Sequence, residues 1–337
     1  MPRLSRLLHR LLSWSLIAAL VLQPVLAQAQ SIVVQGSDTG VRPRVDTSLS
    51  GHPVLNISRP NGAGVSHDVY TEFRTGDAIV NNSATNVNTQ LGGFIEGNPN
   101  LSFGSEAKTW IGEVVGGSQT QLTGILEVAG PSLDMVLANE FGITCNGCGF
   151  YHTNRTTLTT GKPVFNSDGS LRGFNVKRGL VTVGAGGLNP QDRLALGDTS
   201  RVDVIARAAA LYGQMRASEA NIIAGANVVD YNWSYNPNTG LATGITPQAG
   251  TGAVPALAVD VSALGGMYAN AIKLIATEAG VGVRMNGEMA SNSNIALSSS
   301  GRLTLGAPSG SHTPKIKAKR RVQLRAQGPI LLEGSVR

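Results

Sequence analysis

The sequence predicts an all-β solenoid, of which a parallel β-helix is the leading type, and three observations carry that prediction. Gly is abundant at 42 of 337 residues and only 14% of residues are charged, which suits short strands joined by tight turns. Apolar residues make up 42% of the chain, enough to build a core rather than a disordered segment. Apolar residues two apart recur along the second half, many at spacings of about 20 residues, as expected for coils that stack on one another. These pairs are Val181/Val183, Val202/Val204, Ile222/Ala224, Ile272/Leu274, Ile295/Leu297, Leu303/Leu305 and Val322/Leu324.

The first segment, residues 1–29, is predicted to be a secretory signal peptide that is removed after Ala29. It has a basic start at Arg3, Arg6 and Arg10, an apolar run from Leu11 to Leu26, and the small-residue pattern Ala27-Gln28-Ala29. A membrane anchor is the alternative, but polar residues and Pro24 interrupt the run, which falls short of the ~20 apolar residues that a bilayer requires. We therefore expect a soluble, exported mature chain.

The net charge of +6 is unevenly placed. Three of these charges leave with the signal peptide, and residues 315–337 hold seven basic residues against Glu333 alone, so the body before this tail is slightly acidic. The chain is therefore not expected to bind nucleic acid. Lys315, Lys317 and Lys319 alternate with small or apolar residues, which predicts a strand with its lysines on the solvated face. Binding of an anionic surface or glycosaminoglycan by this row is the alternative to an ordinary charged edge.

Two internal segments depart from the pattern. Residues 206–220 contain good helix formers, yet the flanking stretches alternate, so we expect solenoid strands there. Residues 232–255 are dominated by Asn, Thr, Gly and Pro and predict a long exposed loop between residues 30–231 and a second stretch, 256–337. That second stretch finishes on an apolar run at 329–332, which is expected for a solenoid that continues further.

Three blocks resemble the secretion domain of two-partner-secretion exoproteins, the filamentous haemagglutinin family. The first is Thr89-Gln90-Leu91-Gly92-Gly93 followed by Gly97-Asn98-Pro99-Asn100-Leu101, which is similar to the NPxL-type motif. The second comprises residues 124–130 and 143–165, and the third comprises residues 259–268 and 272–283. The resemblance implies a right-handed parallel β-helix with an N-terminal cap, and a transporter-recognition role for Asn98, Pro99, Asn100 and Leu101.

The second motif of this family, of NPNG type, stands here as Asn139-Glu140-Phe141-Gly142-Ile143. Asn139, Gly142 and Ile143 match and are assigned to transporter recognition by the resemblance. The central Pro-Asn pair is replaced by Glu140-Phe141, which lacks the fixed φ of Pro and the turn preference of Asn. We therefore expect either a wider loop at this position or a less conventional engagement of the transporter.

Cys145 and Cys148 are the only cysteines. In a chain that crosses an oxidising periplasm, a disulfide between them is the leading interpretation, and a loop this small contributes about 2 kcal/mol in the chain-entropy model. A redox-active site, a zinc site and free thiols are the alternatives, although a zinc site needs further ligands. None of the five histidines has metal-ligand spacing, and no nucleotide-binding or hydrolase motif is present, so we expect neither a metal nor a cofactor.

The resemblance implies export by the general secretion machinery, recognition in the periplasm by a dedicated outer-membrane β-barrel transporter, and folding at the surface of a Gram-negative cell. It further implies an adhesin or haemagglutinin that binds a receptor on a host or neighbouring cell, with the export part of a contact-dependent growth-inhibition effector as the alternative. A carbohydrate-active β-helix enzyme is the third hypothesis. Its catalytic candidates are Asp192, Asp198 and Asp203 with Arg193 and Arg201, although solvated turn charges are the simpler interpretation.

Overall fold

The computed structural model describes residues 30–190, 201–306 and 313–333. The chain divides into two compact units, Met1–Gln30 and Ser31–Arg337, and the described residues belong almost wholly to the second. The predicted signal peptide therefore lies outside the described residues. All regular elements within these ranges are β-strands, 31 in number. None of these residues belongs to a helix that is long and apolar enough to cross a membrane.

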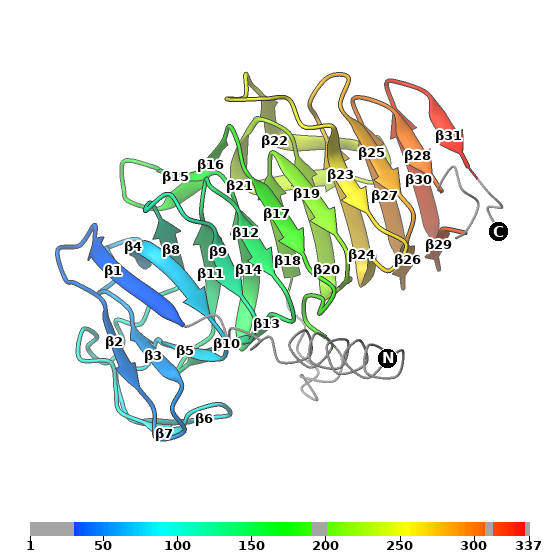
Figure 1. Cartoon of the computed structure of the whole chain (residues 1–337). Helices are drawn as coiled ribbons and strands as arrows, with labels where there is room; N and C mark the ends of the chain where they lie inside the picture. Colours follow the sequence, from blue (N-terminus) through cyan, green and yellow to red (C-terminus); the bar gives the residue numbers. More distant parts are fainter. Residues whose placement is uncertain (1–29, 191–200, 307–312, 334–337) are drawn as a thin grey trace, which may run out of the picture. The chain divides into compact units, whose positions relative to one another are not determined.

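Twenty strands are linked by hydrogen bonds into one main sheet, and every pairing in it is parallel except that of β1 with β4. Figure 1 shows β11, β14, β18, β20, β24 and β27 following one another along this sheet. The strands are β1 (Ser31–Ser37), β4 (Val65–Thr75), β8 (Thr109–Val114), β9 (Thr120–Leu122), β11 (Leu133–Ala138), β12 (Ile143–Cys145), β14 (Thr153–Thr159), β17 (Leu180–Val183), β18 (Arg201–Ala206), β19 (Ala208–Leu211), β20 (Gln214–Ala224), β23 (Leu257–Val261), β24 (Gly266–Ala276), β25 (Gly282–Met285), β26 (Glu288–Ser291), β27 (Asn294–Ser299), β28 (Leu303–Leu305), β29 (Lys315–Ala318), β30 (Arg321–Ala326) and β31 (Ile330–Leu332).

The parallel register stacks apolar residues on apolar residues through successive coils, as expected in a parallel β-helix. One column of directly paired positions runs through Leu137, Leu158, Val204, Ile222, Leu274, Leu297 and Leu324. Burying each such side chain stabilises the fold by about 1.5–3 kcal/mol relative to exposure. The column belongs to one continuous core, so each coil covers the apolar face of the one before it.

The apolar pairs that predicted the solenoid are confirmed as its inward-facing residues. All but the last pair are buried and belong to the main core. The last pair, Val322 and Leu324, lies on β30, where Val322 is exposed and Leu324 is half-buried. The expectation of strands over residues 206–220 is also confirmed, because that segment holds the end of β18, the whole of β19 and the first half of β20.

The loop expected over residues 232–255 is wrong for half of its length, although most of the segment is exposed or half-buried. Its first part completes β21 (Asn227–Asn236) and continues into β22 (Leu241–Pro247), with a tight turn between them in which the Gly240 amide donates to the Asn236 carbonyl. These strands join β15 (Lys162–Phe165) and β16 (Leu171–Val176) in a four-stranded antiparallel sheet, β15-β16-β21-β22. The sequence did not reveal this sheet because β16, which pairs with β21, lies in an earlier segment.

This antiparallel sheet covers the outer side of the main sheet, and a second apolar cluster fills the space between them. Phe174, Val229 and Trp233 from the antiparallel strands pack there with outward-facing residues of the coil such as Ile111 and Ile223. The main ladder continues past the insertion, since β19 pairs with β23 and β20 with β24. Residues 232–255 are therefore an insertion between adjacent coils.

A third layer positions the first motif. The strands β2 (Arg44–Thr47), β3 (Pro53–Asn56), β5 (Ala78–Asn81), β10 (Ile125–Ala129) and β13 (Gly149–Tyr151) form a five-stranded sheet. A hairpin of β6 (Val87–Thr89) and β7 (Gly93–Ile95) packs against it through Val87, Leu91 and Ile95 (Figure 1). At the first coil, β1 runs antiparallel along the edge of β4 opposite β8. This position fits the N-terminal cap that the resemblance implied, and the capping role stays a prediction.

Candidate functional site

Asn98 forms a closed corner after β7, and its hydrogen-bonding groups are used within the chain. Its side-chain Nδ2 donates to the carbonyls of Ile57 at 3.0 Å and Asn81 at 2.8 Å, and its Oδ1 accepts the Asn100 amide at 2.9 Å. The Asn98 carbonyl accepts the Leu101 amide at 3.1 Å, which closes a β-turn over Pro99 and Asn100. Asn98 is only 2% exposed.

Neighbouring asparagines extend this corner into a polar network. The Asn81 side chain donates to the Asn56 side chain at 2.8 Å and to the Glu96 carbonyl at 3.0 Å. Asn100 donates to the Ile57 carbonyl at 3.1 Å, so two asparagines of the motif share one acceptor. A buried polar network is stable only when each of its polar groups has a hydrogen-bond partner. The motif therefore determines how the chain enters and leaves the corner.

Asn139 repeats the same corner between β11 and β12. Its Oδ1 accepts the Phe141 amide at 2.9 Å and its carbonyl accepts the Gly142 amide at 3.0 Å, the i+2 and i+3 pattern seen at Asn98. Its Nδ2 donates to the Ser118 carbonyl at 2.8 Å and to the Thr120 hydroxyl at 3.0 Å. Of the two alternatives, the wider loop is therefore wrong, because Asn139 and Gly142 supply the turn without the central Pro-Asn pair. The less conventional engagement of the transporter stays a prediction.

Gly142 is required by this turn. Its φ of +117° is one that side chains rarely adopt, and a Cβ at this position would meet the Leu180 carbonyl at 2.9 Å. Ile143, the last residue of the motif, begins β12 and is buried in the main core. The matched residues of the second motif are thus the ones that the folded backbone needs.

The two substituted residues lie on the outside of the corner. Glu140 pairs with Lys162 at 3.2 Å and with Arg178 at 3.1 Å, and the Arg178 guanidinium lies 4.4 Å from the centre of the Phe141 ring. Partial burial alone would raise the pKa of Glu140, but hydrogen bonds from Arg178 and Lys162 outweigh it and lower that pKa. Glu140 therefore ties the corner to the antiparallel sheet through Lys162 of β15.

The two motifs are not brought together into one surface. Asn98 bonds to segments near β3 and β5, whereas Asn139 bonds to the segment before β9 and to β9 itself. Among the residues of the first motif, Asn98 and Leu101 are buried, Asn100 is half-buried and Pro99 is exposed. A partner of the folded chain could reach Pro99 but not the Asn98 side chain.

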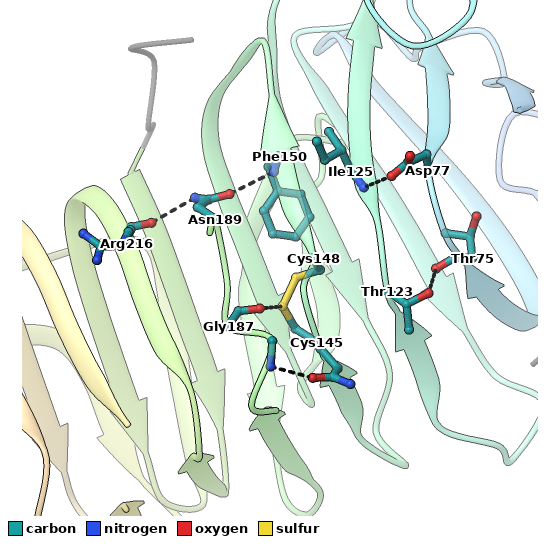
Figure 2. Close-up of a disulfide and its surroundings, with 12 residues drawn as sticks. Thr75, Asp77, Thr123, Ile125, Cys145, Cys148, Phe150, Gly187, Asn189 and Arg216 are labelled. Carbon is teal, nitrogen blue, oxygen red and sulfur yellow. Dashed lines mark hydrogen bonds between the residues drawn. A yellow bond between two sulfur atoms is a disulfide. The ribbon is translucent and has the colours of Figure 1, made fainter. Parts of the chain in front are cut away.

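The two cysteines form a disulfide in the structure, with a Cα–Cα distance of 5.2 Å. Figure 2 shows it at the corner between β12 and β13, where Cys145 Sγ lies 3.4 Å from the Gly187 carbonyl of the next coil. Gly147, between the cysteines, has a φ of +82° and donates its amide to the same carbonyl at 2.8 Å. The bond therefore spans one tight corner directly after the Asn139 turn.

Sequence reasoning missed Glu127, whose buried carboxylate holds the tip of the β6–β7 hairpin. Its two oxygens accept the amides of Gln90 and Leu91, each at 2.7 Å, within the Thr89–Gly93 block that first carried the resemblance. It also missed Asn82, which accepts the Ala107 amide at 2.7 Å and donates to the Pro131 carbonyl at 2.9 Å. The pair Asn81-Asn82 at the end of the apolar strand β5 was the available signal.

Asp203, a candidate of the carbohydrate-enzyme hypothesis, is not a solvated turn charge. It lies on β18, fully buried, with Oδ2 accepting from Arg155 at 2.7 Å and Oδ1 accepting from Arg201 at 3.0 Å and Asn221 at 2.7 Å. The interpretation as a solvated charge is therefore wrong at this position, because Arg155 is itself buried beneath the Tyr231 ring. A carboxylate held in this way cannot meet a polysaccharide. Asp192, Arg193 and Asp198 lie outside the described residues.

The predicted strand with lysines on its solvated face is confirmed for two of the three lysines. Lys315 and Lys317 are exposed on β29, with Lys317 3.8 Å from Glu288 of the preceding coil. Lys319 is exposed just beyond that strand and donates its amide to the Ser291 carbonyl.

The comparisons with known proteins agree with this geometry. Residues 29–305 match the family model described as "TPS secretion domain". The chain is 41% identical to "Toxin CdiA" of Escherichia coli over 89% of its own length and 9% of that protein, and 40% identical to "16S rRNA endonuclease CdiA" of Enterobacter cloacae over 89% and 8%. The crystal structure of the filamentous hemagglutinin secretion domain matches with a TM-score of 0.75 and 32% identity, over 91% of this chain and 96% of that one. The chain thus spans less than a tenth of the length of the two CdiA relatives.

Proposed function

Because the chain belongs to the TPS (two-partner secretion) secretion-domain family, we propose that it is the secretion-and-display domain of a larger exoprotein, recognised by a dedicated outer-membrane β-barrel transporter. The observation that carries the proposal is the stacked parallel coil with a buried asparagine corner at each family motif. In this proposal the chain reaches the periplasm through the general secretion machinery and folds outside the cell.

The transporter meets the motif residues in the extended chain. Asn98 and Asn139 are both buried, so their amides are free to contact a partner only before the corners close. An extended segment can add to a strand edge of a periplasmic domain by main-chain hydrogen bonds. The set proposed for recognition is Asn98, Pro99, Asn100, Leu101, Asn139, Gly142 and Ile143.

Folding outside the cell supplies the direction of transport. Each coil that closes buries another set of stacked apolar residues, as the column from Leu137 to Leu324 illustrates. That burial is favourable and needs no ATP. A chain that folds coil by coil on the outer side is thereby drawn outward.

The activity of the whole exoprotein is a separate part of the proposal. An adhesin or haemagglutinin that binds a receptor on a host or neighbouring cell is supported by the structural match to the filamentous hemagglutinin secretion domain. The export part of a contact-dependent growth-inhibition effector is the second candidate, supported by the higher identity to proteins named as toxins and nucleases. In either case we propose that these residues carry export rather than catalysis.

The test is release from Gram-negative cells that carry or lack the cognate transporter. We expect the chain in the medium only when the transporter is present, and equal release from both strains would overturn the proposal. A second arm tests the first motif, in which Pro99 is exposed and Asn98 is buried. Replacing Asn98, Pro99 and Asn100 with Ala should lower secretion in the transporter strain, and undiminished secretion would rule out recognition at this motif.

A further inference from the structure

The disulfide lies inside the coil, covered on both sides. Both cysteines have 0% exposure and belong to the main core. Cys145 pairs with Leu122 of the preceding coil and with Val183 of the following one, and Cys148 bridges to Leu188. Figure 2 shows Phe150 of the same coil and Gly187 of the next one around the sulfur atoms. Neither sulfur atom can be reached by a second protein once these coils have stacked.

Forming this disulfide requires that a second protein reach a sulfur atom of this chain. A Cys145 or Cys148 thiolate attacks a disulfide of an oxidising protein and forms a mixed disulfide with it, and the other cysteine then displaces that protein. The two cysteines lose two electrons and two protons, and the partner's disulfide becomes a dithiol. Because this exchange needs a sulfur of the partner next to a sulfur of this chain, it cannot take place in the closed coil.

We propose that Cys145 and Cys148 are oxidised in the periplasm on the extended chain, before translocation, so that the chain is a substrate of a periplasmic dithiol-oxidising protein. This inference rests on the proposed function, because only a chain that waits unfolded in the periplasm exposes the pair there.

The position of the two cysteines is compatible with transport of the oxidised chain. Only Asn146 and Gly147 lie between them, so the bond closes one corner and joins no distant segments. The chain on either side stays extended. The closed loop also sets the bend that Gly147 adopts between β12 and β13, directly after the Asn139 turn. Oxidation therefore removes chain entropy from the unfolded state at a corner that folding needs.

The first experiment locates the oxidation step. In cells that lack the transporter, a pulse-labelled chain is quenched with acid and treated with a maleimide reagent before or after reduction. We expect two reactive thiols only after reduction, in a chain that is still sensitive to protease. Two reactive thiols without reduction would place oxidation after export and overturn the proposal. The double variant Cys145→Ser/Cys148→Ser is the matched control and should never react.

The second experiment tests the burial argument on the secreted chain. Dithiothreitol is added to the native and the urea-unfolded protein, and the thiols are counted by alkylation and mass spectrometry. Reduction of the native chain should be at least about tenfold slower, because it waits for local opening. Equal rates would show that the sulfur atoms are accessible and would overturn the inference. Transporter dependence is measured separately, so release without a transporter would end the proposed function and leave the reduction result intact.

Discussion

The Asn98→Ala substitution tests whether the first motif is a folding corner. It removes three hydrogen bonds, two donated by Nδ2 to the carbonyls of Ile57 and Asn81 and one accepted by Oδ1 from the Asn100 amide. At about 1 kcal/mol each, these losses destabilise the folded chain by about 3 kcal/mol, and more if the partner groups stay dry. The Pro99→Ala control touches none of these bonds and should lose less than about 1 kcal/mol.

The assay is urea unfolding of the purified chain, followed by far-UV circular dichroism. The near-isosteric Asn98→Asp variant keeps the acceptor for Asn100 but turns a carboxylate oxygen toward two carbonyl oxygens, so it should lose at least as much stability as Asn98→Ala. A loss below about 1 kcal/mol for Asn98→Ala would refute the reasoning, because it would mean that these buried groups find other partners.

Three further outcomes follow from the structure. Gly142→Ala should destabilise the chain by about 2 kcal/mol or more in the same urea assay, since φ is +117° and the new Cβ would lie 2.9 Å from a carbonyl; a neutral effect would contradict the turn geometry. Glu127→Gln loses one of two acceptors at the β6–β7 hairpin, so amide hydrogen exchange there should quicken while the main sheet stays protected, and uniform exchange would contradict this. Burial alone would lower the pKa of His67, but hydrogen bonds to Glu113 and Asp38 outweigh it and raise that pKa. The stability that His67 contributes is therefore complete below its unfolded value near 6.5 and is lost as pH rises through the raised folded pKa. His67→Gln should remove this part of the pH dependence, with His52→Gln as the histidine control, and an unchanged profile would contradict the pairing.

The corner geometry indicates that a motif proposed for transporter recognition also stabilises the folded coil. Asn98 and Asn139 make the same three kinds of bond, to the i+2 amide, the i+3 amide and two oxygen acceptors on neighbouring segments. In the proposed function, the same residues serve a transporter first and the coil afterwards, because the two uses occur at different times. A secretion defect in an Asn98 variant therefore has to be compared with its stability before it is assigned to recognition.

The sequence by itself determined the fold class. Inward-facing pairs such as Ile222/Ala224 and Ile295/Leu297 recur because every coil must bury the same face, and that periodicity is local enough to read along one chain. The family blocks located both corners because the turn itself is local, closed by the bonds of Asn98 and Asn139 to the amides two and three positions ahead.

Only the tertiary structure decided the features that depend on segments far apart in the chain. The β21–β22 hairpin looked like a loop because β16, its partner, lies more than 50 residues earlier, and Asp203 looked solvated because Arg155, which neutralises it, comes from another coil. The contact of Glu127 with the β6–β7 hairpin and the burial of the Cys145–Cys148 bond could not be predicted for the same reason. Whether a residue faces the core of a coil follows from the alternation of apolar and polar residues around it. Whether a charge is buried, or an inserted segment forms a strand, depends on a partner that the folded chain brings beside it.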